Sequence, residues 1–206
     1  MRIAILGGTG SFGRALAARL VAAGEDVVVG SREAERAREA AGEIGATGAT
    51  NEDAVRGVDL VVLATKADGA LETARAVADA LGATPLLCVA SDIRFEKGVG
   101  MLPDPEALSL AERVQRAVRG PVVAGLHSIA ASNLEEEPPD EDALVCGDDA
   151  RAKELALALA GKVVAGRALD AGPLASARAL EGLTAVIVNL NRRYKAHTGI
   201  RVTGVE

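Results

Sequence analysis

Aromatic side chains are almost absent from this sequence. They make up 1% of its 206 residues, as Phe12, Phe95 and Tyr194, and there is no tryptophan. Proteins that bind single-stranded nucleic acid usually stack bases on several aromatic rings, so this class is disfavoured. Histidine is also scarce: His127 and His197 are far apart in the sequence. They do not form the closely spaced ligand set of a metal motif, and we expect no metal site.

Cysteine, long apolar runs and positive charge are also in short supply. Cys88 and Cys146 belong to no motif, which is typical of a protein from the reducing cytoplasm. No apolar run approaches the roughly 18 residues of a membrane span, and the start, MRIAILGG, does not resemble a signal peptide. The net charge of −6 argues against general nucleic-acid binding. We therefore predict a cytoplasmic protein with no membrane span and no nucleic-acid partner.

The composition, 49% hydrophobic and 25% charged, is that of a folded protein. Short apolar runs alternate with amphipathic segments joined by short loops, which is typical of parallel βαβ units. We predict strands at 2–6, 26–30, 45–47, 58–65, 85–89, 121–125, 143–147 and 162–169, and helices at 14–24, 31–42, 68–81, 104–118, 148–161 and 173–197. For the helix at 104–118, Asp104 is the expected N-cap, with Pro105 in the first position. The fold class is therefore α/β, a doubly wound, mostly parallel Rossmann-type sheet with a small C-terminal part ending in a long helix.

A glycine-rich loop lies between the first predicted strand and helix. It reads G-x-G-x-x-G and consists of Gly8, Thr9, Gly10, Ser11, Phe12 and Gly13. In this position the pattern indicates dinucleotide binding. We expect Gly8 to allow the tight turn, Gly10 to let the backbone approach a pyrophosphate, and Gly13 to let the helix sit close to the strand. The alternative is a glycine-rich turn that binds no ligand.

The end of the second strand indicates which dinucleotide is used. Enzymes specific for NAD usually carry an acid there, which binds the ribose 2′-hydroxyl. This chain has Ser31 and Arg32 instead, followed one helical turn later by Arg36. A hydroxyl and guanidinium groups suit a 2′-phosphate, so we predict NADP(H). The alternative is that Ser31 caps the helix and both arginines are solvated.

Several segments together resemble one enzyme family. These are GGTGSFG, VVGSRE, GLHSIA, VCGDD, LDAGPL and RYKAHTGIR, in this order from residue 1 to nearly 206. They are similar to the NADPH-dependent coenzyme F420 reductases, also called F420H2:NADP oxidoreductases. The resemblance implies reversible hydride transfer between C4 of the nicotinamide and C5 of the 5-deazaflavin. Such a reaction needs two stacked rings and exclusion of water rather than a nucleophile or a metal.

The resemblance also implies which residues bind the deazaflavin. His127 would hydrogen-bond the polar edge of the ring, and Ile129 would pack near the reacting carbons. Arg178 and Thr184, on the long last helix, match family positions that face the same ring. The alternatives are structural: His127 as a satisfied loop histidine, Thr184 bonded back to its own helix, and Arg178 paired with Glu181 at the surface.

The chain departs from the family pattern at three places. Gly182 stands where some relatives have serine, so one hydrogen bond to the deazaflavin is in doubt. After the fourth strand, Thr65-Lys66-Ala67 replaces an Ile-Pro-Trp of relatives, and we keep Ala67 and Leu71 as expected dinucleotide contacts. After the fifth strand the sequence also differs from a Pro-rich pattern, and Ile93 is the expected contact there.

Residues 1–125 are expected to form the NADP-binding Rossmann domain, and residues 126–206 a smaller part that completes the deazaflavin site. The boundary falls somewhere in 120–147. Coenzyme F420 is acidic, and a basic group near the C-terminus could hold its tail; these residues are Arg192, Arg193, Lys195 and Arg201. The alternative is cations that stabilise the end of a helix. The acidic stretch 135–142 is expected to be a solvated loop, and the alternative is a lid.

The last helix looks apolar enough to pair with a second subunit, so we expect a homodimer. Two other functions remain open. One is an NADPH-dependent reductase of a small imine or carbonyl substrate, although 206 residues leave little room for its usual helical domain. The other is a non-catalytic module that senses NADP.

Overall fold

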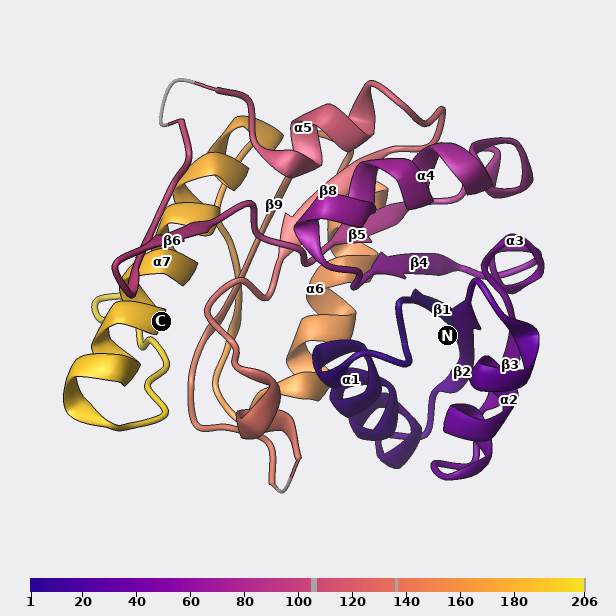
Figure 1. The fold of residues 1–206 in the computed structure, drawn as a ribbon, viewed down its shortest axis with the longest axis horizontal. Coiled ribbons are helices and arrows are strands. Elements are labelled where there is room, and N and C mark those ends of the chain that lie inside the picture. The colour runs from indigo at the N-terminus through magenta and orange to yellow at the C-terminus, as the bar shows by residue number, and fades with distance from the viewer. Residues whose placement is uncertain (105–106, 136, 206) are drawn as a thin grey trace.

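The computed structural model describes residues 1–104, 107–135 and 137–205, and these form one large sheet covered by helices (Figure 1). The order across its eight strands is β10-β9-β8-β5-β4-β1-β2-β3. The strands are β1 (Arg2–Leu6), β2 (Asp26–Ser31), β3 (Thr47–Thr50), β4 (Leu60–Leu63), β5 (Leu86–Cys88), β8 (Val122–Gly125), β9 (Ala143–Gly147) and β10 (Ala168–Asp170). The α-helices are α1 (Ser11–Ala22), α2 (Ala34–Gly42), α3 (Asn51–Ala54), α4 (Ala67–Leu81), α5 (Leu110–Gln115), α6 (Ala150–Val163) and α7 (Ala177–Tyr194).

The sheet has the doubly wound topology that the sequence predicts. The chain starts at β1 in the middle, passes through β2 to the edge strand β3, and then returns to β4 on the other side of β1. The strand order therefore reverses between β1 and β4, where ligands bind in such sheets. All neighbouring strands are parallel except β8 and β9, which are antiparallel. The expectation of parallel units is wrong at this pair, because the described residues between β8 and β9, 126–135 and 137–142, hold only a 3-10 turn (Ala131–Leu134) and no crossover α-helix.

Helices cover both faces of the sheet because its central strands are apolar on both sides. Ile3 and Ile5 of β1 point to the core under α1, α2 and α6, whereas Ala4 and Leu6 point to the core under α3, α4 and α5. All four residues are fully buried. Figure 1 shows α1 and α6 on one side of the sheet and α4 and α5 on the other. This three-layer packing aligns the carboxyl ends of β1, β4 and β5 at one edge.

Most elements differ from their predicted bounds by a few residues, and two of them differ more. Helix α5 begins at Leu110, because Ser109 and Glu112 form a reciprocal capping box, with the Ser109 oxygen 3.1 Å from the Glu112 nitrogen. Asp104 is therefore not its N-cap, and the predicted first position, Pro105, lies outside the described residues. The strand predicted at 162–169 is shorter, since α6 continues to Val163 and β10 begins at Ala168.

The last helix carries a small hairpin that the sequence pattern does not predict. Strands β6 (Arg94–Glu96) and β7 (Val99–Met101) pair with each other, apart from the main sheet. Asn189 of α7 holds the hairpin by accepting from the Gly100 nitrogen at 2.7 Å and donating to the Gly100 oxygen at 2.9 Å. In Figure 1 the hairpin lies alongside α7, at the end of the molecule opposite to β3.

Candidate active site

The glycine loop between β1 and α1 forms a tight turn whose glycines are required by close backbone approaches. A Cβ on Gly13 would collide with the carbonyl oxygen of Gly7, and one on Gly8 would lie 2.9 Å from Cγ1 of Val29. Gly7 has a φ of +80°, whereas Gly8 does not have a positive φ. Gly7 supplies the positive φ, and Gly8 is a central residue of the turn that the Gly10 nitrogen closes on Gly7 oxygen at 3.0 Å. Gly8 is also needed because β2 packs against it. Gly13 has the predicted packing role.

Helix α1 directs its free N-terminus at the space beside this loop. Gly10 is its N-cap, with no side chain to satisfy the first N–H groups. A Cβ on Gly10 would have Gly7 oxygen at 3.3 Å as its nearest neighbour, so the outer side of the loop is open. Unpaired N–H groups and the positive end of the helix dipole make such a site favourable for a phosphate.

A cavity of about 670 Å³ opens at this point. Its size is that of ligand pockets, which span about 300–1,000 Å³. The glycine loop, the end of β2 and the start of α4 supply its walls. The lining residues are Gly7, Thr9, Gly10, Ser11, Phe12, Ser31, Arg32, Glu33, Arg36, Asn51, Ala64, Thr65, Lys66, Asp68, Gly69, Glu72, Thr73 and Ala76. The cavity thus brings together the predicted residues Thr9, Gly10, Ser11, Phe12, Ser31, Arg32 and Arg36.

The residues after β2 are arranged as an anion would require. Helix α2 takes Glu33 as its N-cap, and the Ser31 hydroxyl accepts from the Glu33 nitrogen at 3.4 Å. Ser31 is therefore not the N-cap, and its proton remains available to a ligand. Arg36 lies 3.6 Å from Glu33, and both side chains are 67% exposed, so this pair is weak. Arg32 is exposed and has no ion pair within the described part of the chain.

Two polar atoms in the cavity wall are buried without a hydrogen-bond partner. They are Oδ1 of Asn51 and Oγ1 of Thr65. Asn51 begins α3, and its Oδ1 lies where a Cβ on Gly30 would be only 2.9 Å away. Buried polar groups are rarely left unpaired, so these atoms favour a polar ligand here. A dinucleotide therefore fits the residues present.

Several residues that line this cavity are not predicted from the sequence. Asn51 and Thr65 each follow a strand that ends at the ligand edge, which was the available signal. On α4 the cavity contacts Asp68, Gly69, Glu72, Thr73 and Ala76. The predicted contacts Ala67 and Leu71 instead pack partly buried against the core. The helical repeat places the cavity-lining residues and the core-packed residues on different faces of α4. A dinucleotide contact for Ala67 and Leu71 stays a prediction.

The second group of predicted residues lies on a turn that follows β8. Leu126 has a φ of +63°, a sparsely populated conformation for a residue with a side chain. Backbone hydrogen bonds join the Leu126 nitrogen to Leu144 oxygen at 3.2 Å and the Ile129 nitrogen to Leu126 oxygen at 3.1 Å. Strain of this kind persists where surrounding contacts determine the conformation, and it is concentrated at functional sites.

His127 is buried in this turn, with 6% of its surface exposed. Neither ring nitrogen bonds a side chain of the described residues. Burial lowers the pKa of His127 to about 4, although the nearby Ala90 carbonyl favours the protonated form. The imidazole is therefore neutral near pH 7, with one nitrogen able to donate and the other to accept. The role of His127 toward the deazaflavin stays a prediction, and so does the alternative of a loop histidine satisfied by the backbone, here by the Ala90 carbonyl. Ile129 is likewise buried.

Helix α7 supports this turn. The hydroxyl of Thr184 donates to the carbonyl of His127 at 2.8 Å and lies 3.4 Å from Leu180 oxygen. Back-bonding to its own helix is thus the longer of the two contacts. A Cβ on Gly182 would meet Cδ1 of Leu102 at 3.5 Å, an ordinary contact that leaves room for serine.

Arg178 forms an ion pair with Glu181 at 2.7 Å, and its guanidinium also donates to Asp104 oxygen. This pair is not at the surface: Glu181 is completely buried and accepts from the Leu110 nitrogen at 2.6 Å. Burial raises the pKa of Glu181, while the Leu110 and Arg178 hydrogen bonds oppose the shift. Glu181 therefore joins α7 to the start of α5, and Arg178 neutralises its charge. A contact of Arg178 with the deazaflavin stays a prediction, as it does for half-buried Ile93.

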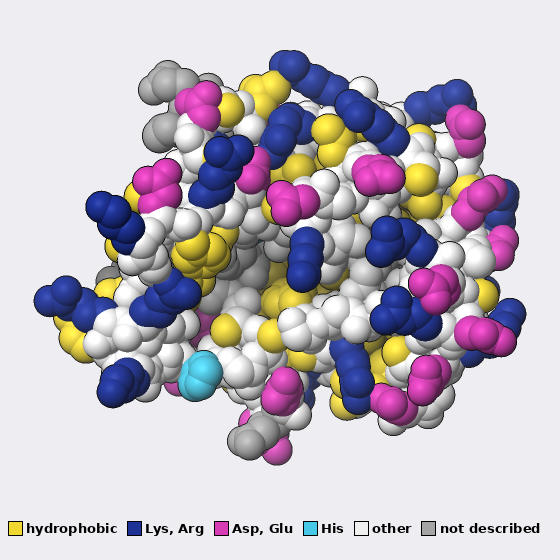
Figure 2. Space-filling view, in the orientation of Figure 1, with side chains coloured by type: hydrophobic (Ala, Val, Ile, Leu, Met, Phe, Trp, Pro, Cys, Tyr) yellow, Lys and Arg dark blue, Asp and Glu magenta, His cyan; other side chains and the backbone are white. Residues whose placement is uncertain are grey.

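Both groups of residues lie at the carboxyl ends of the parallel strands. Figure 2 shows this face of the molecule hollowed between the region of β6 and α7 and the loops that follow β1 and β4. Hydrophobic side chains lie along the edge of the hollow, and basic side chains lie on its rim. A recess at this place suits the reaction, because hydride transfer needs two stacked rings with water kept out.

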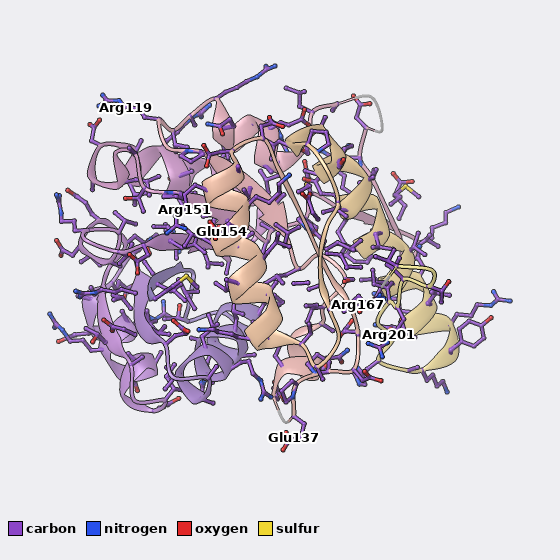
Figure 3. All side chains as sticks on the ribbon, turned by 180° about the vertical axis from the view of Figure 1, so that it is seen from behind. Arg119, Glu137, Arg151, Glu154, Arg167 and Arg201 are labelled. Carbon is purple, nitrogen blue, oxygen red and sulfur yellow. The ribbon has the colours of Figure 1, made fainter. Side chains whose placement is uncertain are left out.

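The acidic stretch 135–142 is not simply a solvated loop. Glu141 and Asp142 are 3% and 0% exposed. Asp142 forms an ion pair with Arg167 at 2.7 Å and accepts from the Val202 nitrogen at 2.8 Å, so it fastens the C-terminal segment. The expectation fails because the two residues next to β9 are drawn into the interior by that segment. Figure 3 shows Arg167 and Arg201 close together at this end.

The basic C-terminal residues are dispersed rather than gathered on one site. Arg201 pairs with Asp140 at 3.1 Å, and Arg192 stacks on the Phe95 ring with 4.9 Å between the guanidinium carbon and the ring centre. His197 lies beyond the end of α7, and its Nδ1 is 3.0 Å from the Ser132 hydroxyl. A role of these cations in holding an acidic tail stays a prediction.

Cys88 and Cys146 are both buried, and burial raises the pKa of Cys88 to about 12 and that of Cys146 to about 11. Both are core residues. Among the described residues no helix is long and apolar enough to cross a membrane. In the same part of the chain there is no group of three His, Cys, Asp or Glu side chains that could hold a metal ion.

The fold and the site define a dinucleotide-binding protein of the doubly wound α/β class. Residues 2–90 match the family model described as NADP oxidoreductase coenzyme F420-dependent. The whole chain is 37% identical to the F420-dependent NADP reductase of Methanothermobacter thermautotrophicus, covering 96% of it. It is 34% identical to that of Methanocaldococcus jannaschii, with both chains fully covered. The chain belongs to the F420-dependent NADP reductase family.

Solved structures agree with this family. A candidate F420-dependent NADP-reductase from Arthrobacter sp. FB24 superposes with a TM-score of 0.85 at 28% identity, covering 98% of this chain and 99% of that one. An imine reductase from Streptomyces aurantiacus has a TM-score of 0.64 at 24% identity. This likeness shows the fold alone, and the chain spans 62% of the imine reductase.

Proposed function

We propose that this protein transfers a hydride reversibly between NADP(H) and the 5-deazaflavin coenzyme F420. The observation that carries the proposal is that the dinucleotide cavity and the His127 turn lie at the same edge of the sheet. The NADP-type cavity has Ser31 and Arg32 where an NAD site has an acid. The neutral His127, whose ring bonds no side chain of the described residues, lies on a strained turn at the same edge. Full-length relatives named F420-dependent NADP reductase support this function.

Each part of the site has its own task. The N–H groups at the start of α1 bind the pyrophosphate, and Arg32 with Ser31 binds the 2′-phosphate. His127 donates to the polar edge of the deazaflavin, and Ile129 packs against the ring. When both coenzymes are bound, the nicotinamide and the deazaflavin supply the hydride chemistry themselves. The protein contributes position, exclusion of water and a hydrogen bond toward charge that changes during transfer.

The test is to mix the purified protein with NADPH and oxidised F420 and to follow the loss of the visible absorbance of the deazaflavin. FMN under the same conditions is the control, because a general flavin reductase would reduce both. NADPH oxidation by a small imine or carbonyl, with no reduction of F420, would instead identify the alternative reductase. NADPH binding without turnover of any deazaflavin would identify a sensing module.

We also propose a division of labour along the chain, in which residues 1–125 bind NADP(H) and residues 126–206 complete the deazaflavin site. The location we propose is the cytoplasm, which suits two buried free thiols.

The oligomeric state we propose is a homodimer formed through α7. Val186, Leu190 and Tyr194 repeat every four residues on this helix and are 53%, 39% and 67% exposed. Leu190→Glu should convert the dimer to a monomer in sedimentation or light scattering.

A further inference from the structure

Two hydroxyl groups and one backbone carbonyl, from distant parts of the sequence, form a hydrogen-bond series that ends at His127. Ser91 lies in the loop after β5, Thr184 lies on α7, and the carbonyl belongs to His127 in the turn after β8. The two hydroxyl oxygens are 2.8 Å apart, and Thr184 Oγ1 is also 2.8 Å from His127 oxygen.

The donor and acceptor of each hydrogen bond in this series follow from the number of protons available. Thr184 has one hydroxyl proton, and the carbonyl of His127 can only accept. At 2.8 Å this carbonyl is a better acceptor than the Leu180 oxygen at 3.4 Å, so Thr184 donates to His127. Thr184 must then accept from Ser91. Ser91 therefore directs the Thr184 hydroxyl, and Thr184 has no second proton with which to bind a ring.

The carbonyl that receives this hydrogen bond belongs to a strained segment. Leu126, immediately before His127, has a φ of +63°. No side chain of the described residues bonds either nitrogen of the His127 ring, and the polar group that acts on the ring is the backbone carbonyl of Ala90. The position of the imidazole therefore depends on the backbone of the turn, and Thr184 bonds that backbone at His127 itself. A displacement of about 1 Å at a reacting centre can cost 10²-fold in rate.

We propose that Ser91 is a positioning residue for hydride transfer, which acts through Thr184 on the backbone of His127. Thr184 is part of the same hydrogen-bond series, and its role is to hold the turn that contains His127 rather than to donate to the deazaflavin. This inference rests on the proposed function, since the reaction that it tunes is the reduction of the deazaflavin.

The kinetic test compares variants that keep or remove each hydroxyl. Ser91→Ala and Thr184→Val should each lower kcat with F420 by about 3- to 10-fold, the range of one neutral hydrogen bond. The double variant should lose little more than the more severe single variant, because both changes interrupt the same series. Ser91→Thr and Thr184→Ser should keep most of the activity. The dissociation constant of NADPH, measured by titration, should stay unchanged in all of them.

A second readout does not depend on turnover. The protein has two histidines, so imidazole NMR signals are few, and a His197→Gln variant assigns them. Ser91→Ala and Thr184→Val should shift the His127 signals and leave those of His197 in place. Ser132→Ala is the matched control: it removes the hydroxyl 3.0 Å from His197, should shift only the His197 signals, and should leave kcat unchanged.

Two results would overturn the inference. One is unchanged kcat and unchanged His127 signals in both Ser91→Ala and Thr184→Val; the other is fully additive losses in the double variant. Failure of the proposed function looks different, because the unaltered protein would then fail to reduce F420. The NMR comparison would still report whether Ser91 and Thr184 control the His127 turn.

Discussion

The Asp142 carboxylate and the Arg167 guanidinium lie 2.7 Å apart, and the carboxylate is completely buried. The Val202 nitrogen donates to the same carboxylate at 2.8 Å, and the Arg167 guanidinium also donates to the carbonyl of Val202. The pair therefore joins the start of β9, the loop before β10 and the C-terminal segment. The Arg167 hydrogen bond is the largest of the effects that hold the pKa of Asp142 well below its usual value.

The first prediction concerns this pair. A carboxyl with a lowered pKa in the folded state stabilises the protein above its unfolded pKa, near 3.8, and the contribution is lost as pH falls below that value. Asp142→Asn should therefore lower Tm at pH 7, and the difference from the unaltered protein should shrink below about pH 4. Thermal unfolding across pH measures this. Asp140→Asn, at an exposed pair, should leave Tm nearly unchanged.

The choice between dinucleotides should depend on Arg32. Arg32→Ala should weaken NADPH binding by roughly 1.5–3 kcal/mol, as expected for a hydrogen bond to a charged group, and NADH binding should barely change. Fluorescence titration with each dinucleotide is the measurement. Arg38→Ala is the matched control, since Arg38 lies on α2, which follows Arg32, but does not line the cavity. Equal losses for NADPH and NADH would rule out a 2′-phosphate contact.

The deazaflavin site should respond to the side chain of His127. His127→Ala should lower kcat/KM for F420 by about ten-fold to a few hundred-fold, because it removes a donor aimed at charge that develops during transfer. His127→Asn, which keeps a donor, should recover part of the loss. Steady-state kinetics and NADPH titration distinguish the outcomes. A loss of NADPH affinity instead would place the turn on the nucleotide side of the hollow.

The neutral state of His127 also predicts a pH dependence of stability. The folded pKa of about 4 lies below the unfolded value of 6.5, so between these values the unfolded chain binds more protons. The free energy of unfolding should therefore fall as pH falls from about 6.5 to 4, by up to about 3 kcal/mol. Urea unfolding at a series of pH values measures this. In His127→Leu the corresponding slope should disappear, whereas His197→Gln should leave it in place.

Gly182 offers a change that should improve the protein. Its position has room for a Cβ, and serine has the higher helix propensity, so Gly182→Ser should raise the free energy of unfolding by about 0.5 kcal/mol. If the added hydroxyl reaches the deazaflavin, KM for F420 should fall by about 2- to 10-fold. Gly161→Ser, inside α6 with open space around it, is the control: it should gain stability without a change in KM.

The doubly wound sheet could be predicted because its signals are local. The glycine loop, the apolar runs of β1 and β4, and the Ser31–Arg32 pair are each contained within a few residues. The hairpin β6–β7 was missed because its side chains are exposed and show no buried periodicity: Phe95 and Val99 are 50% and 51% exposed. Its position depends on Asn189, which is 89 residues beyond Gly100 in the sequence.

The sequence by itself determined the class of fold, the position of the glycine loop and the preference for a phosphorylated dinucleotide. These features can be recognised from residue type and short-range spacing, because glycine gives the backbone freedom and because helices and strands have different periods. Only the tertiary structure decided that His127 is neutral, that Glu181 is buried under α5 and that Asp142 fastens the C-terminal segment. Protonation and pairing of a buried group depend on which distant residues exclude water from it, and those contacts form only when the chain folds.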